Sequence, residues 1–104
     1  MSPREVQPPE GRYQGRNKVY ASSSARRGWE QLCQEKPGPM RRCYIELADN
    51  PFPPGQLPRH HQLKGKLRGQ WEYEVTGGDR VRYKRGPAGE VVVTRAGSAP
   101  ADTH

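Results

Sequence analysis

Positively charged side chains gather in the second half of the chain, where they could bind phosphate groups. Between Leu57 and Arg85 the sequence holds eight lysines and arginines against three acidic residues, so this segment carries +5 of the formal net charge of +7. The eight are Arg59, Lys64, Lys66, Arg68, Arg80, Arg82, Lys84 and Arg85. Such a concentration attracts polyanions through counterion release, or an acidic protein through charge complementarity. A solvated basic surface has the same composition, so charge alone leaves all three interpretations open.

Cysteines and histidines are the other groups that could do chemistry. Cys33 and Cys43 form no CxxC motif and have no cysteine or histidine at metal-ligand spacing. We therefore expect two small buried residues, no metal site and no cofactor. His60 and His61 are adjacent, and an imidazole exchanges protons near neutral pH. They lie in a proline-flanked loop, where the simpler expectation is exposure to solvent.

Length and composition limit the scaffold that can position these groups. A chain of 104 residues with 31% hydrophobic residues can support one small core. Residues 1–16 lack an apolar period and are predicted to be a disordered leader, followed by a single domain over residues 17–104. No stretch approaches the roughly 18 apolar residues of a membrane span, and no apolar run resembles a signal peptide. We therefore expect a cytoplasmic protein without a membrane partner.

Two helices are predicted in the first half of the domain. Apolar residues recur at helical spacing in two consecutive sets, which are Ala25, Trp29, Leu32 and Cys33, then Met40, Cys43, Tyr44, Leu47 and Ala48. Ser23 or Ser24 would cap the first helix, because a serine side chain accepts a backbone N–H bond. Residues 37–39, Pro-Gly-Pro, should end that helix. The second should end before Pro51, since the residue preceding a proline is pushed out of the α region.

Strands follow the proline-rich loop, because the apolar period changes there from 3.6 to 2. Apolar and polar residues alternate in two neighbouring runs, Gln70-Trp71-Glu72-Tyr73-Glu74-Val75 and Arg80-Val81-Arg82-Tyr83-Lys84. If the apolar sides lie on the helices, the glutamates and arginines share the opposite face. Residues 91–94 are valine-rich and predict a third strand, and residues 18–22 predict a short strand before the helices. The predicted fold is α+β in the order β-α-α-β-β-β, with an N-terminal helical hairpin packed on one face of a small, twisted, mostly antiparallel sheet.

Several motifs in this arrangement resemble the RelE/ParE toxin superfamily. The stretch LKGKLRGQWEYEVTGGDRVRYKRG, followed by a valine-rich strand and AGSAPADTH, is similar to the C-terminal half of those toxins. The motifs GWEQLC, NPFPP and LKGKL resemble a small actinobacterial-type branch of the superfamily. The resemblance covers residues 18–104, so the leader lies outside it.

The resemblance implies the toxin of a type II toxin–antitoxin pair, most often a ribosome-dependent endoribonuclease that cuts mRNA in the A site. In such toxins, cations offset phosphate charge while a base activates the ribose 2′-hydroxyl to attack the adjacent phosphate, without a metal. By position in the motifs, Arg80 resembles the arginine that contacts the scissile phosphate, and Arg95 would be a second phosphate contact. His61 falls near the place of an acid/base carboxylate. The residues expected to hold the RNA backbone are Lys64, Lys66, Arg68 and Arg82.

Departures from the family pattern favour a second hypothesis. Glu72 and Glu74 stand where nuclease members often carry lysines, and a carboxylate repels phosphate unless it is paired. Arg80 could equally form a cross-strand ion pair with one of them. Ala99 stands where the branch often has a histidine, and His104 lies at a terminus, a poor place for a preorganised acid. The alternative is a catalytically incomplete binding module on the same fold, which inhibits DNA gyrase or binds RNA or an antitoxin.

Both hypotheses imply the same protein partner. A basic toxin of this superfamily is normally neutralised by an acidic, partly disordered antitoxin that folds on binding. The nuclease hypothesis adds the ribosome and mRNA as partners. Neither hypothesis implies a small-molecule cofactor.

Overall fold

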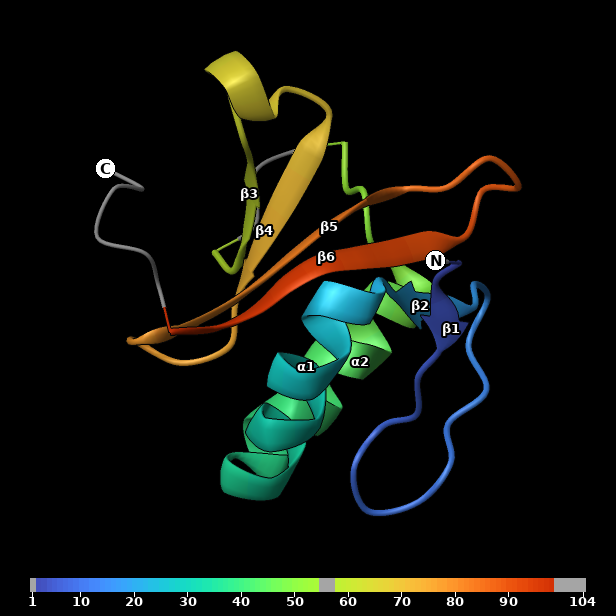
Figure 1. The fold of residues 1–104 in the computed structure, drawn as a ribbon, viewed down its shortest axis with the longest axis vertical. Coiled ribbons are helices and arrows are strands. Elements are labelled where there is room, and N and C mark those ends of the chain that lie inside the picture. The colour runs from blue at the N-terminus through green and yellow to red at the C-terminus, as the bar shows by residue number, and fades with distance from the viewer. Residues whose placement is uncertain (1, 55–57, 99–104) are drawn as a thin grey trace.

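The computed structural model describes residues 2–54 and 58–98 as two helices on one face of a six-stranded sheet (Figure 1). The helices are α1 (Ser23–Glu35) and α2 (Pro37–Asp49). The strands are β1 (Arg4–Glu5), β2 (Val19–Ala21), β3 (His60–Gln62), β4 (Gln70–Glu74), β5 (Asp79–Arg85) and β6 (Val91–Ser98). A short 3₁₀ turn, η1 (Gly65–Leu67), joins β3 to β4. The predicted α+β architecture, with the helical hairpin on one sheet face, is confirmed; β1 and β3 are additional strands.

The last strand lies in the middle of the sheet. The spatial order is β1-β2-β6-β5-β4-β3, and among the described strands only the β2–β6 pair is parallel. The parallel pairing arises because the two helices carry the chain across the sheet between β2 and the later strands. β4 and β5 form the predicted hairpin, and its register places Glu72 opposite Arg82 and Glu74 opposite Arg80.

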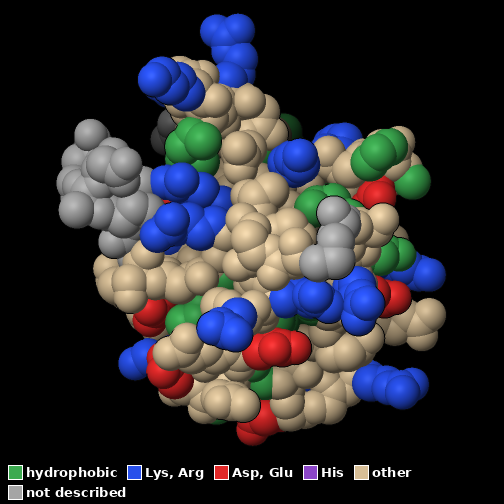
Figure 2. All heavy atoms as spheres, in the orientation of Figure 1, with side chains coloured by type: hydrophobic (Ala, Val, Ile, Leu, Met, Phe, Trp, Pro, Cys, Tyr) green, Lys and Arg blue, Asp and Glu red, His purple; other side chains and the backbone are tan. Residues whose placement is uncertain are grey.

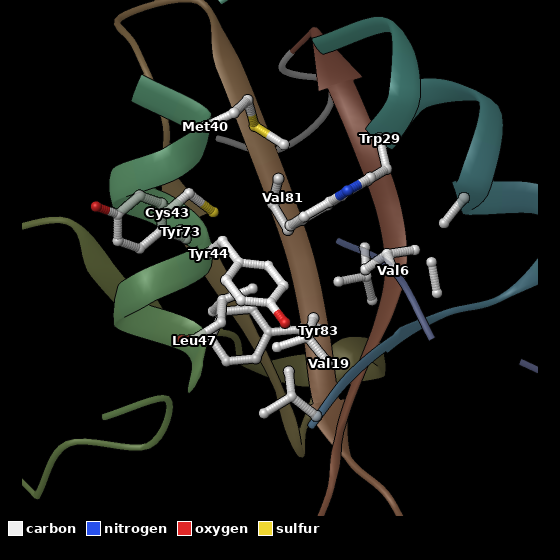
Figure 3. Close-up of a cluster of buried hydrophobic side chains, with 14 of the residues drawn as sticks. Val6, Val19, Trp29, Met40, Cys43, Tyr44, Leu47, Tyr73, Val81 and Tyr83 are labelled. Atoms are coloured by element: carbon white, nitrogen blue, oxygen red, sulfur yellow. The ribbon is translucent and has the colours of Figure 1, made fainter. Parts of the chain in front are cut away.

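The core fills the space between the helices and the sheet (Figure 3). Trp29 of α1 and Met40 and Leu47 of α2 are at most 1% exposed and face buried residues of the central strands, including Val81 and Tyr83. All nine residues of the two predicted helical faces are buried except Cys33, which is half-buried. The helical period thus identified the core-facing side of both helices.

The helix ends differ from the predicted ends by small amounts. Ser22 caps α1, and its hydroxyl accepts a bond from the Ala25 amide at 3.3 Å, so the cap lies one residue before the two predicted serines. α1 ends at Glu35, before Pro37 as predicted, and Pro37 also begins α2. Its fixed φ suits the first helical position, where the backbone N–H has no helical partner. The second helix ends at Asp49, before Pro51 as predicted.

The segment for which a disordered leader was predicted, residues 1–16, packs against the domain over its described part, residues 2–16. Residues 4 and 5 form β1 against β2, and Val6 is 7% exposed within the core. Tyr13 donates a hydrogen bond to Asp49 at the end of α2. The composition of the segment is polar, but a few buried residues and many bonds to its backbone hold it on the domain.

The two histidines belong to strand β3 and not to a loop, and the predicted exposure is correct for His61 and wrong for His60. His60 is 4% exposed, with Nδ1 at 3.0 Å from the Tyr83 hydroxyl and Nε2 at 3.0 Å from Glu46 Oε1. Tyr83 donates its own proton to the Pro51 carbonyl at 2.6 Å, and burial raises the pKa of this phenol. His61 points to the other face and is exposed. Because successive side chains of a strand point to opposite faces, His60 is buried in the domain and His61 lies on its surface.

Candidate functional site

Most of the predicted site residues lie on the sheet face opposite the helices. Residues that are directly opposed on neighbouring strands point to the same side, and the register opposes Arg82 to Glu72 on β4 and to Arg95 on β6. His61 of β3 is opposed to Glu72 in the same way. We call this side the charged face; it carries His61, Gln70, Glu72, Glu74, Arg80, Arg82, Lys84 and Arg95.

Glu72 is the centre of the charged face. Its Oε2 lies 3.1 Å from Arg82 Nε, and its Oε1 lies 3.8 Å from Arg80 Nε. The Glu72 side chain is 10% exposed and that of Arg82 is 13% exposed, so both charges are largely removed from water. One carboxylate thus holds two of the predicted phosphate-binding arginines.

Arg80 is also tied to the turn between β4 and β5. Its Nη1 donates to the carbonyls of Thr76 at 2.6 Å and Asp79 at 3.1 Å, while Nη2 lies 3.8 Å from Glu74 Oε1. The cross-strand ion pair that was the alternative role for Arg80 is therefore present. A phosphate at this position would have to compete with a carboxylate for the guanidinium.

His61 lies at the outer end of the same row of charges. Its Nε2 is 3.7 Å from Glu74 Oε1, the oxygen that also faces Arg80. The His61 side chain is 50% exposed, so its imidazole can reach solvent and a surface ligand. Glu74 thereby links the candidate base to the candidate phosphate contact.

A shallow cleft of about 460 Å³ lies beside the ion pairs. It is lined by Ser24, Leu67, Gln70, Arg82, Thr94, Arg95 and Ala96. The register of β5 and β6 shifts at Thr94, which is an extra residue of β6 with no opposed residue on β5. The Thr94 hydroxyl donates to Gln70 Oε1 of β4 at 2.8 Å, across strand β5. The cleft therefore combines two arginines with a polar floor, and neither Gln70 nor Thr94 was predicted as a site residue.

The remaining predicted cations stand around η1. Lys64, Lys66 and Arg68 are exposed, and within the described residues their side chains make no hydrogen bond or ion pair. Figure 2 shows lysine and arginine side chains projecting at the end of the molecule formed by η1 in Figure 1. Leu67 of this turn lines the cleft, so the three cations stand near its rim.

The other sequence predictions on the site concern metals and the C-terminus. Within residues 2–54 and 58–98, no three His, Cys, Asp or Glu side chains are grouped so that they could hold a metal ion. No helix in this part of the chain is long and apolar enough to cross a membrane. Ala99 and His104 lie outside the described residues.

The fold is similar to that of several solved bacterial toxins. A YoeB/ParE toxin from Agrobacterium tumefaciens superposes with a TM-score of 0.60 at 21% identity, over 79% of this chain and 98% of that chain. The YoeB dimer from Staphylococcus aureus gives a TM-score of 0.65 at 12% identity, over 83% of this chain and 100% of that chain. YafQ in the E. coli DinJ-YafQ toxin–antitoxin complex gives 0.60 at 15% identity, over 80% and 92%.

No protein-family model matches the sequence, and no curated protein matches it significantly. At these identities the likeness establishes a RelE-like fold. It does not extend to the actinobacterial-type branch. A shared fold does not establish a shared chemistry, which depends on the residues of the site.

Proposed function

We propose that this protein is the toxin of a type II toxin–antitoxin pair and that it cuts mRNA on the ribosome. The observation that carries the proposal is the charged face, where Arg80, Arg82, Arg95 and His61 lie together on a fold shared with YoeB and YafQ toxins. The exposed cations at η1 extend this surface. A single strand of RNA laid across it would meet positive charge along its length.

In the proposed reaction, Arg95 and the forked guanidinium of Arg80 bind the scissile phosphate. Arg80 turns from the carboxylates toward the phosphate oxygens, and it offsets the charge that develops as the phosphorus becomes five-coordinate. His61 takes the proton of the 2′-hydroxyl, whose oxygen bonds to phosphorus as the bond to the 5′-oxygen breaks. The leaving 5′-oxygen takes a proton from solvent. Glu74 beside His61 Nε2 favours the tautomer with the proton on that nitrogen, which leaves Nδ1 free as the base.

Lys64, Lys66, Arg68 and Arg82 have the supporting role of binding the RNA backbone. Three of them are exposed at η1, and Arg82 lines the cleft beside Arg95. Their contribution would be electrostatic and independent of sequence. Choice of the cleavage site then depends on the ribosome that presents the mRNA.

The neutralising partner is proposed to be an acidic antitoxin. The chain carries a formal charge of +7, and the related YafQ was solved in a complex described as toxin–antitoxin. An acidic, initially disordered chain suits such a surface, because it gains charge pairing and apolar burial together when it folds.

A specific observation favours a second candidate function, inhibition by binding without cleavage. Glu72 and Glu74 neutralise Arg80 and Arg82 in the structure, with the shortest separation at 3.1 Å. A face held in this state could bind RNA, DNA gyrase or an antitoxin through its remaining cations without doing chemistry. The two functions share the fold and differ in whether His61 is needed.

The test is induced expression of the whole chain in bacteria, with growth and mRNA 5′ ends measured together. The informative variant is His61→Ala, since this half-exposed side chain lies outside the core cluster. Arg80→Lys removes the fork and keeps the charge, and Arg27→Ala, on exposed α1 surface, is the matched control. Circular dichroism checks that each variant folds.

Cleavage within codons that is lost with His61→Ala and Arg80→Lys, but kept with Arg27→Ala, is the expected result. Growth arrest without new 5′ ends, unchanged by His61→Ala, would establish the binding function instead. No arrest with the natural chain would contradict both candidates as growth inhibitors.

A further inference from the structure

The N-terminal arm, residues 2–12, is bound to the domain as a peptide is bound to a receptor. Arg4 is opposed to Ala21 and Glu5 to Tyr20 in an antiparallel ladder, and the Val6 amide donates to the Val19 carbonyl at 2.9 Å. The arm thereby covers the edge of β2, as Figure 1 shows for β1. Addition of a strand to a free sheet edge is a common mode of peptide recognition.

Two side chains from the helices bind the arm beyond the ladder. Trp29 Nε1 of α1 donates to the Gln7 carbonyl at 3.3 Å. Arg41 Nη1 of α2 faces three successive carbonyls, those of Pro9, Glu10 and Gly11, at 3.1 to 3.3 Å. Every acceptor is a main-chain oxygen, so these donors recognise the backbone and not a particular side chain.

Selectivity for side chains is confined to two positions of the arm. Val6 is 7% exposed within the core cluster, and Pro8 is buried, whereas Arg4, Glu5 and Gln7 are exposed. The groove made by the β2 edge, Trp29 and Arg41 therefore accepts a strand with a small β-branched residue, followed two positions later by proline.

The arm pairs with β2 over a short ladder, and an unfavourable turn follows it. Its ladder has only two opposed pairs. Beyond it the chain turns at Glu10 and Gly11, whose φ values are +61° and +106°, and the positive φ of Glu10 is unfavourable for a residue with a side chain. Segments with short ladders and little buried apolar surface open at a fraction of the free energy of global unfolding.

We propose that this groove is an exchangeable peptide site, which the chain's own arm fills and which an extended segment of a partner protein fills when the arm leaves. The partner segment has a Val-x-Pro-like pattern and binds through its main chain as a replacement edge strand. This inference is independent of RNA cleavage, because none of the residues involved lies on the charged face.

The first test uses the full chain and a fluorescein-labelled peptide of residues 2–12, SPREVQPPEGR. In the natural chain the tethered arm competes at an effective concentration of the order of millimolar, which hides the groove. Val6→Asp in the full chain places a charge in the core and releases the arm. Fluorescence anisotropy should then show the labelled peptide binding at least about tenfold more tightly than to the natural chain.

Matched variants separate groove binding from adhesion to a loosened protein. The same peptide carrying Val6→Asp should not bind, and Arg41→Ala added to the Val6→Asp chain should weaken binding of the natural peptide severalfold. Equal binding of both peptides, or no binding by a Val6→Asp chain whose circular dichroism is native, would overturn the proposal.

If Val6→Asp does not fold, hydrogen exchange in the natural chain tests whether the arm opens separately from the domain. The Val6 amide, bonded to the Val19 carbonyl, should exchange at least about tenfold faster than the Val91 amide, bonded to the Lys18 carbonyl. If the two amides exchange at the same rate, by global unfolding only, the arm does not open separately and the proposal is wrong.

Discussion

Replacing Glu72 by glutamine should increase affinity for single-stranded RNA. The carboxylate lies 3.1 Å from Arg82 Nε and 3.8 Å from Arg80 Nε, and its side chain is only 10% exposed, so it is a strong local competitor of phosphate. Glutamine keeps an oxygen for Arg82 Nε but removes the charge. Each arginine that becomes available for a phosphate steepens the dependence of log K on log salt concentration by about 0.7.

The size of the effect follows from that slope. Raising the salt concentration from 50 to 200 mM lowers the affinity for RNA. With one released arginine this fold loss of affinity is about 2.6 times that of the natural chain, and with two it is about 7 times. Fluorescence anisotropy with a labelled single-stranded RNA across this salt range measures the slope directly. Affinity at 50 mM should be higher for Glu72→Gln than for the natural chain.

Glu30→Gln is the matched control, because it removes the same charge from exposed α1 surface on the other side of the sheet. At about 0.1 M salt, charges separated by more than roughly 10 Å are largely screened, so the control should leave the slope unchanged. If Glu72→Gln and Glu30→Gln give the same slope and affinity, phosphate does not meet Arg80 and Arg82, and the assignment of the charged face is refuted.

Three further predictions concern the scaffold. Tyr83→Phe removes a buried hydroxyl that has two hydrogen-bond partners, so it should lower the free energy of unfolding by about 1–3 kcal/mol in chemical denaturation. Tyr73→Phe removes a buried hydroxyl that has no hydrogen-bond partner in the described structure, so it should be nearly neutral. Equal losses of stability in the two variants would contradict this. Gly28→Ala should destabilise by about 1–3 kcal/mol, because its Cβ would overlap a carbonyl oxygen of β6, while Gly38→Ala, with open space around it, should not lower the denaturation midpoint. Burial raises the pKa of Cys33 to about 11, so its alkylation rate should keep rising up to that pH instead of levelling near 9.

The general architecture could be predicted because periodicity and turn chemistry agree along most of the chain. Alternation in β4 and β5 predicted both the apolar side and the face that the glutamates share with the arginines. Residues 2–16 and β3 were not predicted, since short strands leave no period to detect. Val6 in particular is one of two buried residues in a polar segment, and it belongs to a core cluster with Val19 and Trp29, which follow it by 13 and 23 positions.

The candidate site was predicted less completely than the fold. Alternation placed Arg80 and Arg82 on one face, and the strand registers add Arg95 and His61, to which the sequence assigned no face. The cleft beside them depends on the extra residue at Thr94, and a register shift of one residue leaves no mark in the sequence. The sequence also could not tell which of two adjacent histidines is buried, because the strand that decides it has three residues.

The parallel pair of β2 and β6 has a consequence for synthesis and folding. Val19 is opposed to Val91, which the ribosome adds 72 residues later, and β6 then lies between the β1–β2 pair and the strands β5, β4 and β3. The early part of the chain therefore waits with unpaired backbone groups until the central strand arrives, and closing so long a loop makes folding slow. Any product truncated before Val91 lacks the strand that joins the two halves of the sheet, so premature termination yields an unfolded chain open to proteolysis.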